Sequence, residues 1–96
     1  MADQFSVVPP VQQVPVSIVV ADRGFVYVGR ATVDERNNVL IREAKCIRVW
    51  GTTEGLAQLA LQGPQSKTIL DKAGTVRIPS HAVMHTIECD QSKWGS

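Results

Sequence analysis

The chain lacks a large excess of charge of either sign. Its 96 residues carry ten Lys and Arg against nine Asp and Glu, which gives a formal net charge of +1. A dedicated duplex-DNA-binding protein usually has a strong basic excess, so this balance argues against that class. It is compatible with a small anionic ligand, which needs only about two or three well-placed donors.

The chain also has few cysteines and no long apolar run. Cys46 and Cys89 are its two cysteines, and their spacing in sequence does not define a disulfide. The longest apolar runs fall well short of a membrane span. Residues 1–5 have neither the basic region nor the apolar stretch of a signal peptide. We therefore expect no membrane association, and a cytoplasm in which the thiols stay reduced.

No metal-binding or catalytic signature is present. His81, His85 and Cys89 are metal-ligand types, but four residues along a strand span about 13 Å, which is too far for one metal ion. A Cys–His nucleophilic pair lacks an identifiable third group to orient it. We therefore predict a protein that is not an enzyme, with no catalytic residues, no metal and no cofactor.

The length fits one small domain with a modest core. Pro9, Pro10 and Pro15 remove backbone donors, so residues 1–15 are predicted to form an extended or disordered arm. Residues 16–90 are the predicted single β-rich domain, and residues 91–96 a frayed tail. Because so small a core is marginal alone, we expect a homo-oligomer.

Short runs rich in β-branched residues predict strands. Asp22–Gly24 supplies a turn between the first two, which form a hairpin, and Gly29 within the second marks a bulge or a close backbone approach. Pro79 is expected to bend or flip the chain between the last two. The predicted strands cover residues 16–21, 25–33, 39–41, 45–50 (or from 44), 67–70, 75–78 and 82–89.

One short helix follows the fourth of these strands. Thr52 or Thr53 is its expected cap, with Glu54 in the first turn, and Gly63 before Pro64 ends it. Apolar residues at 56, 59 and 60 form the stripe that must lie on the sheet. The predicted fold class is therefore β-rich α+β, a small barrel or sandwich of about six short, mostly antiparallel strands with one short helix.

The junction of strand and helix is the candidate ligand site. A helix start presents free N–H groups to an anion, threonine hydroxyls add donors, and an indole can stack on a base. The alternative is a core tryptophan beside an ordinary Thr-capped helix. Residues 63–68 resemble the end of a phosphate loop but lack the required glycine before lysine, so a solvated turn is favoured. The predicted ligand-binding residues are Arg48, Trp50, Gly51, Thr52, Thr53 and Lys67.

The segments 20–26, 47–56, 63–68 and 74–76, above all Trp50-Gly51-Thr52-Thr53, resemble a family of small phage and prophage proteins of unknown function. The resemblance implies a phage accessory protein in the cytoplasm of a host bacterium. Two functions follow as expectations. The first is counter-defence by sequestering a small, nucleotide-like anion, and the second is a protein-interaction module that inhibits a host factor.

Overall fold

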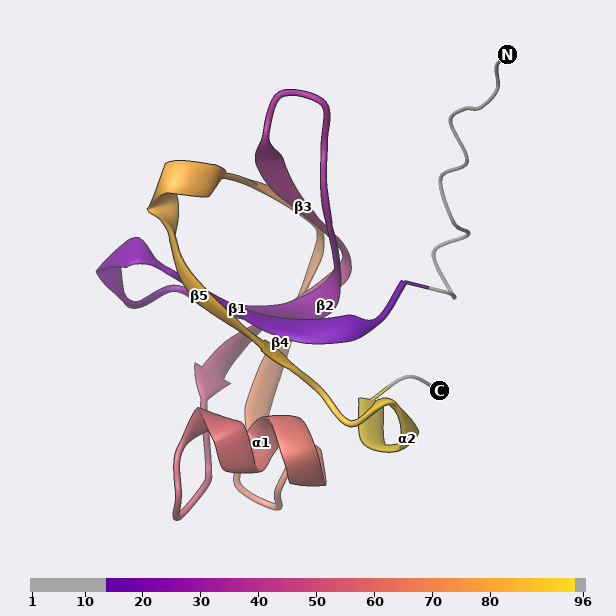
Figure 1. Ribbon diagram of the computed structural model, residues 1–96. Coiled ribbons are helices and arrows are strands. Elements are labelled where there is room, and N and C mark those ends of the chain that lie inside the picture. Colours follow the sequence, from indigo (N-terminus) through magenta and orange to yellow (C-terminus); the bar gives the residue numbers. More distant parts are fainter. Residues whose placement is uncertain (1–13, 95–96) are drawn as a thin grey trace.

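The protein is represented by a computed structural model that describes residues 14–94 (Figure 1). The predicted arm therefore lies outside the described residues up to position 13, as do positions 95 and 96 of the predicted tail. Five strands form one antiparallel sheet in the order β4-β3-β2-β1-β5. They are β1 (Val16–Ala21), β2 (Val26–Val33), β3 (Asn38–Val49), β4 (Ile69–Pro79) and β5 (Val83–Glu88).

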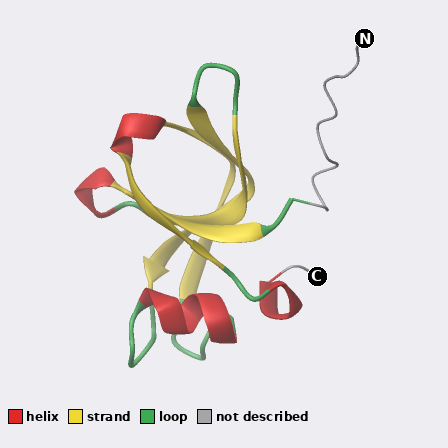
Figure 2. Cartoon of the chain, viewed as in Figure 1, coloured by secondary structure: helices red, strands yellow, loops and turns green. Residues whose placement is uncertain are grey.

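The sheet curls into a barrel-like ring, which Figures 1 and 2 show end-on. Helix α1 (Leu56–Gln62) lies between β3 and β4 in the chain, and the single turn α2 (Gln91–Trp94) follows β5. Two short 3₁₀ turns, η2 (Asp22–Gly24) and η3 (Ser80–Ala82), join β1 to β2 and β4 to β5. The predicted fold class, a small β-rich barrel with a short helix, is confirmed.

The number of strands differs from the prediction because two pairs of predicted strands are continuous. Residues 39–41 and 45–50 were expected to be separate, but both belong to β3, apart from Trp50, which follows it. Glu43 has a positive φ of 54°, and the register with β4 shifts between Ile41 and Ala44. A bulge of this kind bends a strand while its pairing resumes on both sides. The predicted strands 67–70 and 75–78 are likewise joined, because the residues from Ile69 to Pro79 all belong to β4.

Gly29 is a close-approach position, as the sequence predicted. The register of β2 with β3 shifts around it, between Val28 and Arg30. A Cβ atom at Gly29 would lie 2.6 Å from Cγ2 of Ile41 and 2.9 Å from the carbonyl oxygen of Arg42. Only glycine allows the two strands to come this close at the bend.

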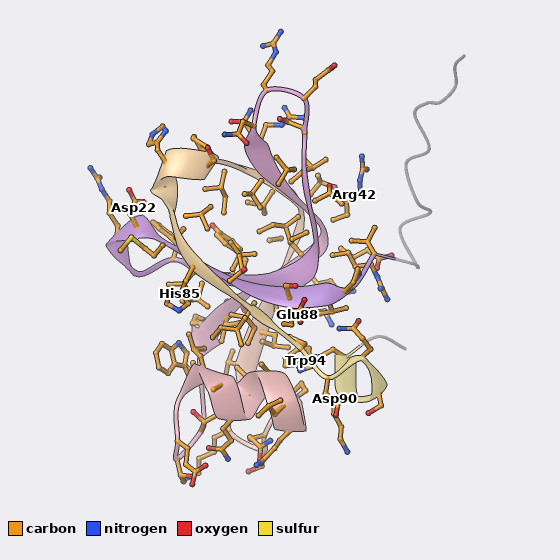
Figure 3. The ribbon with its side chains drawn as sticks, viewed as in Figure 1. Asp22, Arg42, His85, Glu88, Asp90 and Trp94 are labelled. Carbon is orange, nitrogen blue, oxygen red and sulfur yellow. The ribbon has the colours of Figure 1, made fainter. Side chains whose placement is uncertain are left out.

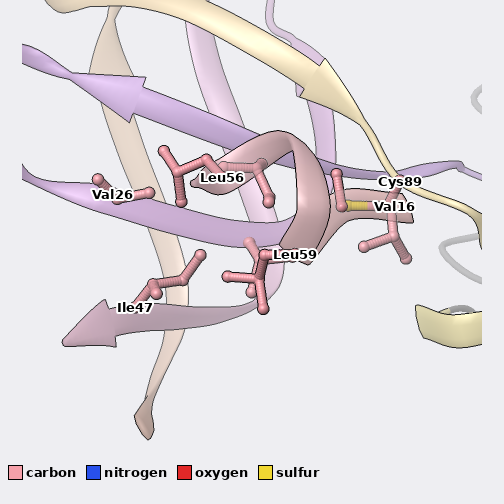
Figure 4. Close-up of a cluster of buried hydrophobic side chains, with 9 residues drawn as sticks. Val16, Val26, Ile47, Leu56, Leu59 and Cys89 are labelled. Atoms are coloured by element: carbon pink, nitrogen blue, oxygen red, sulfur yellow. The ribbon is translucent and has the colours of Figure 1, made fainter. Parts of the chain in front are cut away.

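The curled sheet has apolar residues on both of its faces. Inside the ring, Val19, Ala21, Ile41, Ala44 and Ile78 form one buried cluster. On the outer face, α1 covers a second cluster, which Figure 4 shows in close-up. Its buried members are Val16, Ile18, Val26, Val28, Ile47, Leu56, Leu59, Ala60 and Cys89.

The start of α1 corrects the sequence prediction. The helix begins at Leu56, its N-cap is Gly55, and no side chain caps it. Thr52 instead accepts a hydrogen bond from the Gly55 N–H at 3.2 Å, within the loop before the helix. The positive φ of 90° at Gly55 turns the chain into the helix, a conformation that a capping threonine would not adopt readily. The predicted end at Gly63 is confirmed.

The predicted frayed tail is also wrong for residues 91–94. They form α2, and the Trp94 indole N–H lies 3.1 Å from the carbonyl oxygen of Leu59 and 3.2 Å from that of Ala60. Trp94 also packs against the outer cluster. Trp94 therefore anchors residues 91–94 to α1, although the polar residues beside it suggested a frayed tail.

Candidate functional site

The polar residues that connect β2 to β3 form a compact hub around one carboxylate. Oδ1 of Asp34 accepts the backbone N–H groups of Arg36 and Asn38, each at 2.9 Å. Oδ2 of Asp34 lies 3.5 Å from Nε of Arg77 on β4. Asn37 takes a positive φ of 64°, which asparagine tolerates better than most residues. The loop is thus held by its own backbone donors.

These hydrogen bonds hold the pKa of the Asp34 carboxyl below its usual value. The largest cause is the N–H of Asn38, followed among the lowering contributions by that of Arg36, and Arg77 adds a smaller Coulombic effect. Asp34 is therefore a carboxylate at neutral pH. The N–H groups of Arg36 and Asn38 and the Nε of Arg77 balance its charge. The side chains of Arg36 and Arg77 are both exposed.

The loop is tied to the turn between β4 and β5. The side-chain amide of Asn37 donates to Oγ of Ser80 in η3 at 3.1 Å. Beside this contact lies an open hollow of about 460 Å³, lined by Asp34, Glu35, Arg36, Asn38 and Arg77. The Arg36 and His81 side chains are exposed. The rim of this hollow, which we call the loop site, therefore offers two guanidinium groups, and His81 follows Ser80 in the chain.

The chemistry of the loop site suits an anion joined to a planar group. Guanidinium groups bind phosphate oxygens bidentately and can stack on bases. Of the two carboxylates that line the hollow, Asp34 already accepts two backbone hydrogen bonds, and Glu35 is exposed.

The low pKa of Asp34 gives a testable pH dependence. A carboxyl whose folded pKa is lowered contributes stability above its unfolded value, and this is lost as pH falls through the folded pKa. We expect Asp34→Asn to lower the melting temperature at pH 5–7, with the difference shrinking below the ordinary Asp value of 3.8 and disappearing below the lower folded pKa. Asp90, also lowered in pKa by Ser92, is common to both proteins. Thermal unfolding followed from pH 7 to pH 2 measures this, and parallel curves would contradict it.

The residues predicted from the sequence to bind a ligand lie at the other end of β3. Arg48 forms a bidentate ion pair with Asp71, at 2.8 and 3.3 Å. The backbone carbonyl of Trp50 accepts the hydroxyl of Thr68 at 2.8 Å, and the indole is 43% exposed. A side chain at Gly51 would collide with the backbone of Lys67 and Thr68, so the structure does bring Trp50, Gly51 and Lys67 together.

The free N–H groups expected at this corner are not free. Oε1 of Gln58 accepts the backbone N–H groups of Thr53 and Glu54, at 3.0 and 2.7 Å. Together with the Arg48–Asp71 pair, this removes most of the donors on which the sequence argument depended. A ligand-binding role for the six residues stays a prediction, and the geometry favours the loop site instead.

Sequence reasoning missed the loop site although part of its signal was visible. The run from Asp34 to Asn38 is charged and holds two asparagines, which tolerate a positive φ, and Asn37 has one. Nothing in the local pattern shows that Ser80 or Arg77 would lie beside it. That placement follows from the register, in which Asn38 pairs with Pro79.

The expectations of no metal site and no membrane span can be compared with residues 14–94. Among them, no group of three or more His, Cys, Asp or Glu side chains is placed to hold a metal ion. Cys46 and Cys89 are both free thiols, and burial raises the pKa of Cys89 to about 11. No helix within the described range is long and apolar enough to cross a membrane.

Comparison with solved structures shows the fold. The chain superposes on a heptameric archaeal Sm protein, described for its implications for the eukaryotic snRNP core, with a TM-score of 0.53. The identity is 15%, over 80% of this chain and 88% of that one. A Pyrococcus abyssii Sm protein in complex with a uridine heptamer gives a TM-score of 0.49 at 18% identity, over 78% and 83% of the two chains. No protein-family model and no curated protein matches this sequence.

This likeness corrects the function expected from the sequence. We expected a phage accessory protein that sequesters a nucleotide-like anion in counter-defence or inhibits a host factor. The fold is instead that of an archaeal Sm protein described as heptameric, with implications for the eukaryotic snRNP core. The resemblance to phage proteins, which depends on segments around the Trp50 corner, stays a prediction.

Proposed function

We propose that this protein is a homo-oligomeric, non-enzymatic protein that binds single-stranded RNA at the loop site. The observation that carries the proposal is the Sm-like fold, shared with a protein that is heptameric. The identity of 15% supports the fold alone. The assembly and the ligand are instead supported by this chain's own residues.

The edges of the sheet support assembly. Within residues 14–94, β4 and β5 each pair with one strand, β3 and β1 respectively, so each has an unpaired edge. Open edges present rows of backbone donors and acceptors to another chain. Because η3 connects these two strands, pairing at both edges would carry the loop site of every copy to the junctions between copies.

The loop site supports single-stranded RNA as the ligand. Single-stranded RNA is recognised by hydrogen bonds to splayed bases and by stacking on aromatic rings or on arginine planes. Arg36 and Arg77 supply such groups, and the amide of the neighbouring Asn37 donates to Ser80. A net charge of +1 fits a ligand held by a few contacts in each copy, with affinity gained by repeating the site around an oligomer.

Two measurements test the proposal. Native mass spectrometry is expected to give a closed homo-oligomer. Fluorescence anisotropy with a single-stranded oligoribonucleotide is expected to show binding, with duplex DNA of equal length bound much more weakly. A monomer at micromolar concentration would overturn the assembly, and the absence of RNA binding would overturn the function.

Variants locate the binding. Arg36→Gln combined with Arg77→Gln is expected to weaken RNA binding about tenfold at low salt, because two charged donors are lost. Lys93→Gln, an exposed charge on α2, is the control and should leave the affinity within about twofold. If the double variant binds as well as the wild type, RNA does not bind at the loop site.

A further inference from the structure

The outer face of β3 and β4 carries an unusual cross-strand pair of like charges. The register places Lys45 of β3 directly opposite Lys72 of β4. Both side chains are exposed, and neither has an ion-pair partner among residues 14–94. Like charges directly opposite each other destabilise a sheet. The pair therefore lowers the stability of the free protein.

A second like-charge pair lies on the same face. Arg30 of β2 is opposite Arg42 of β3. The Arg30 side chain is buried, donating to Oε1 of Glu43 at 3.0 Å and to the carbonyl of Val14 at 2.8 Å. Arg42 is exposed, and Figure 3 shows it pointing outward from the ring. Glu43 thus neutralises Arg30. The positive charge of Arg42 adds to those of Lys45 and Lys72.

The strand parity puts these charges on one face of the sheet, where Glu43 binds Arg30. Lys45 and Lys72 lie two positions from Ile47 and Leu70, which are opposite each other and pack in the outer cluster. They therefore share the outer face. Asp71 is opposite Cys46 on the other face, where it binds Arg48. Arg42, Lys45 and Lys72 are all exposed, and none of the three forms an ion pair among residues 14–94.

This strip continues to the loop site. Arg77, which lines the loop site, is opposite Leu40 on β3 and has the same outward parity as Arg42. From Leu40 to Lys45 the strand covers roughly 17 Å at about 3.4 Å per residue. A backbone that leaves the loop site near Arg77 would meet Arg42 first and then the two lysines.

We propose that Arg42, Lys45 and Lys72 form an outer track for the phosphate backbone of single-stranded RNA. The track, which rests on the RNA-binding function proposed above, extends the ligand from the loop site along β3 and β4. Phosphates neutralise the like-charge repulsion that the free protein bears, and such contacts position nucleic acid without reading its sequence. The track therefore predicts binding that is tighter for longer strands and independent of the bases along it.

The test uses the full chain and two double variants that lose equal charge. Lys45→Gln with Lys72→Gln removes the track, and Arg23→Gln with Lys93→Gln is the control. Each lost phosphate contact reduces the salt slope for a single strand by about 0.7, so we expect the slope to fall by about 1.4 and the low-salt affinity by about tenfold. The control should leave the slope unchanged. Anisotropy titrations across a series of salt concentrations measure both.

A third variant separates binding from stability. Lys45→Glu creates an opposite-charge pair with Lys72, so the melting temperature should rise while RNA affinity falls more than in the glutamine variant. If wild type binds RNA but the track variants match the control in slope and affinity, the outer track is overturned and the loop site stands. If wild type binds no RNA, the track and the proposed function both fail.

Discussion

Replacing Leu59 with alanine should lower the free energy of unfolding by about 3 kcal/mol. The side chain is 0% exposed and belongs to the outer cluster, where α1 meets the sheet. Deleting a buried leucine loses its transfer free energy and leaves a cavity, which costs about 2–5 kcal/mol in other cores. For a domain of this size the loss is a large fraction of the total stability. Urea denaturation at a fixed protein concentration measures it.

The matched control lies two residues further along the same helix. Leu61 is 62% exposed, so Leu61→Ala should change stability by less than about 0.5 kcal/mol. The two variants remove the same atoms and substitute the same residue in the same helix. A small effect in both would mean that α1 is not held on the sheet through Leu59, which would contradict the packing in Figure 4.

Local patterns in the sequence were sufficient for most of the strands. β-branched runs predicted the β1–β2 hairpin, and the spacing of Leu56, Leu59 and Ala60 predicted the buried face of α1. The continuity of β3 could not be predicted. Glu43 with a positive φ is a conformation that the bend imposes, because a charged residue has no intrinsic preference for it. The pairing of β3 with its neighbouring strands determined that the polar residues around Glu43 form a bulge within one strand.

The candidate site shows the same division between local and distant information. The turn at Asn37 could be predicted from residue type, but its partner Ser80 is 43 positions away. At the Trp50 corner the sequence placed donors correctly near a helix start. It could not show that Gln58 and Asp71 would take those donors. Which polar groups remain available is set by side-chain partners that spacing alone does not reveal.

Replacing Gly29 with alanine should cost about 2 kcal/mol or more of stability. The added Cβ would lie 2.6 Å from Cγ2 of Ile41, which is 0% exposed and has no space to move into. It would also lie 2.9 Å from the Arg42 carbonyl and 3.1 Å from the Ala44 Cα. Forcing extra atoms into a packed site typically costs about 1–3 kcal/mol. Thermal and urea unfolding both measure the loss.

Gly24→Ala is the control, because it isolates backbone strain from crowding. Gly24 has a positive φ of 82° but nothing lies within 4 Å of an added Cβ, so only the conformational cost of about 1 kcal/mol applies.

Gly29 is crowded because β2 passes close to the bulge in β3. That bend brings the outer-face residues Arg30 and Arg42 opposite each other. Gly29→Ala should therefore also weaken RNA binding in the fraction that folds, and a variant with full stability and affinity would show that the bend does not depend on Gly29.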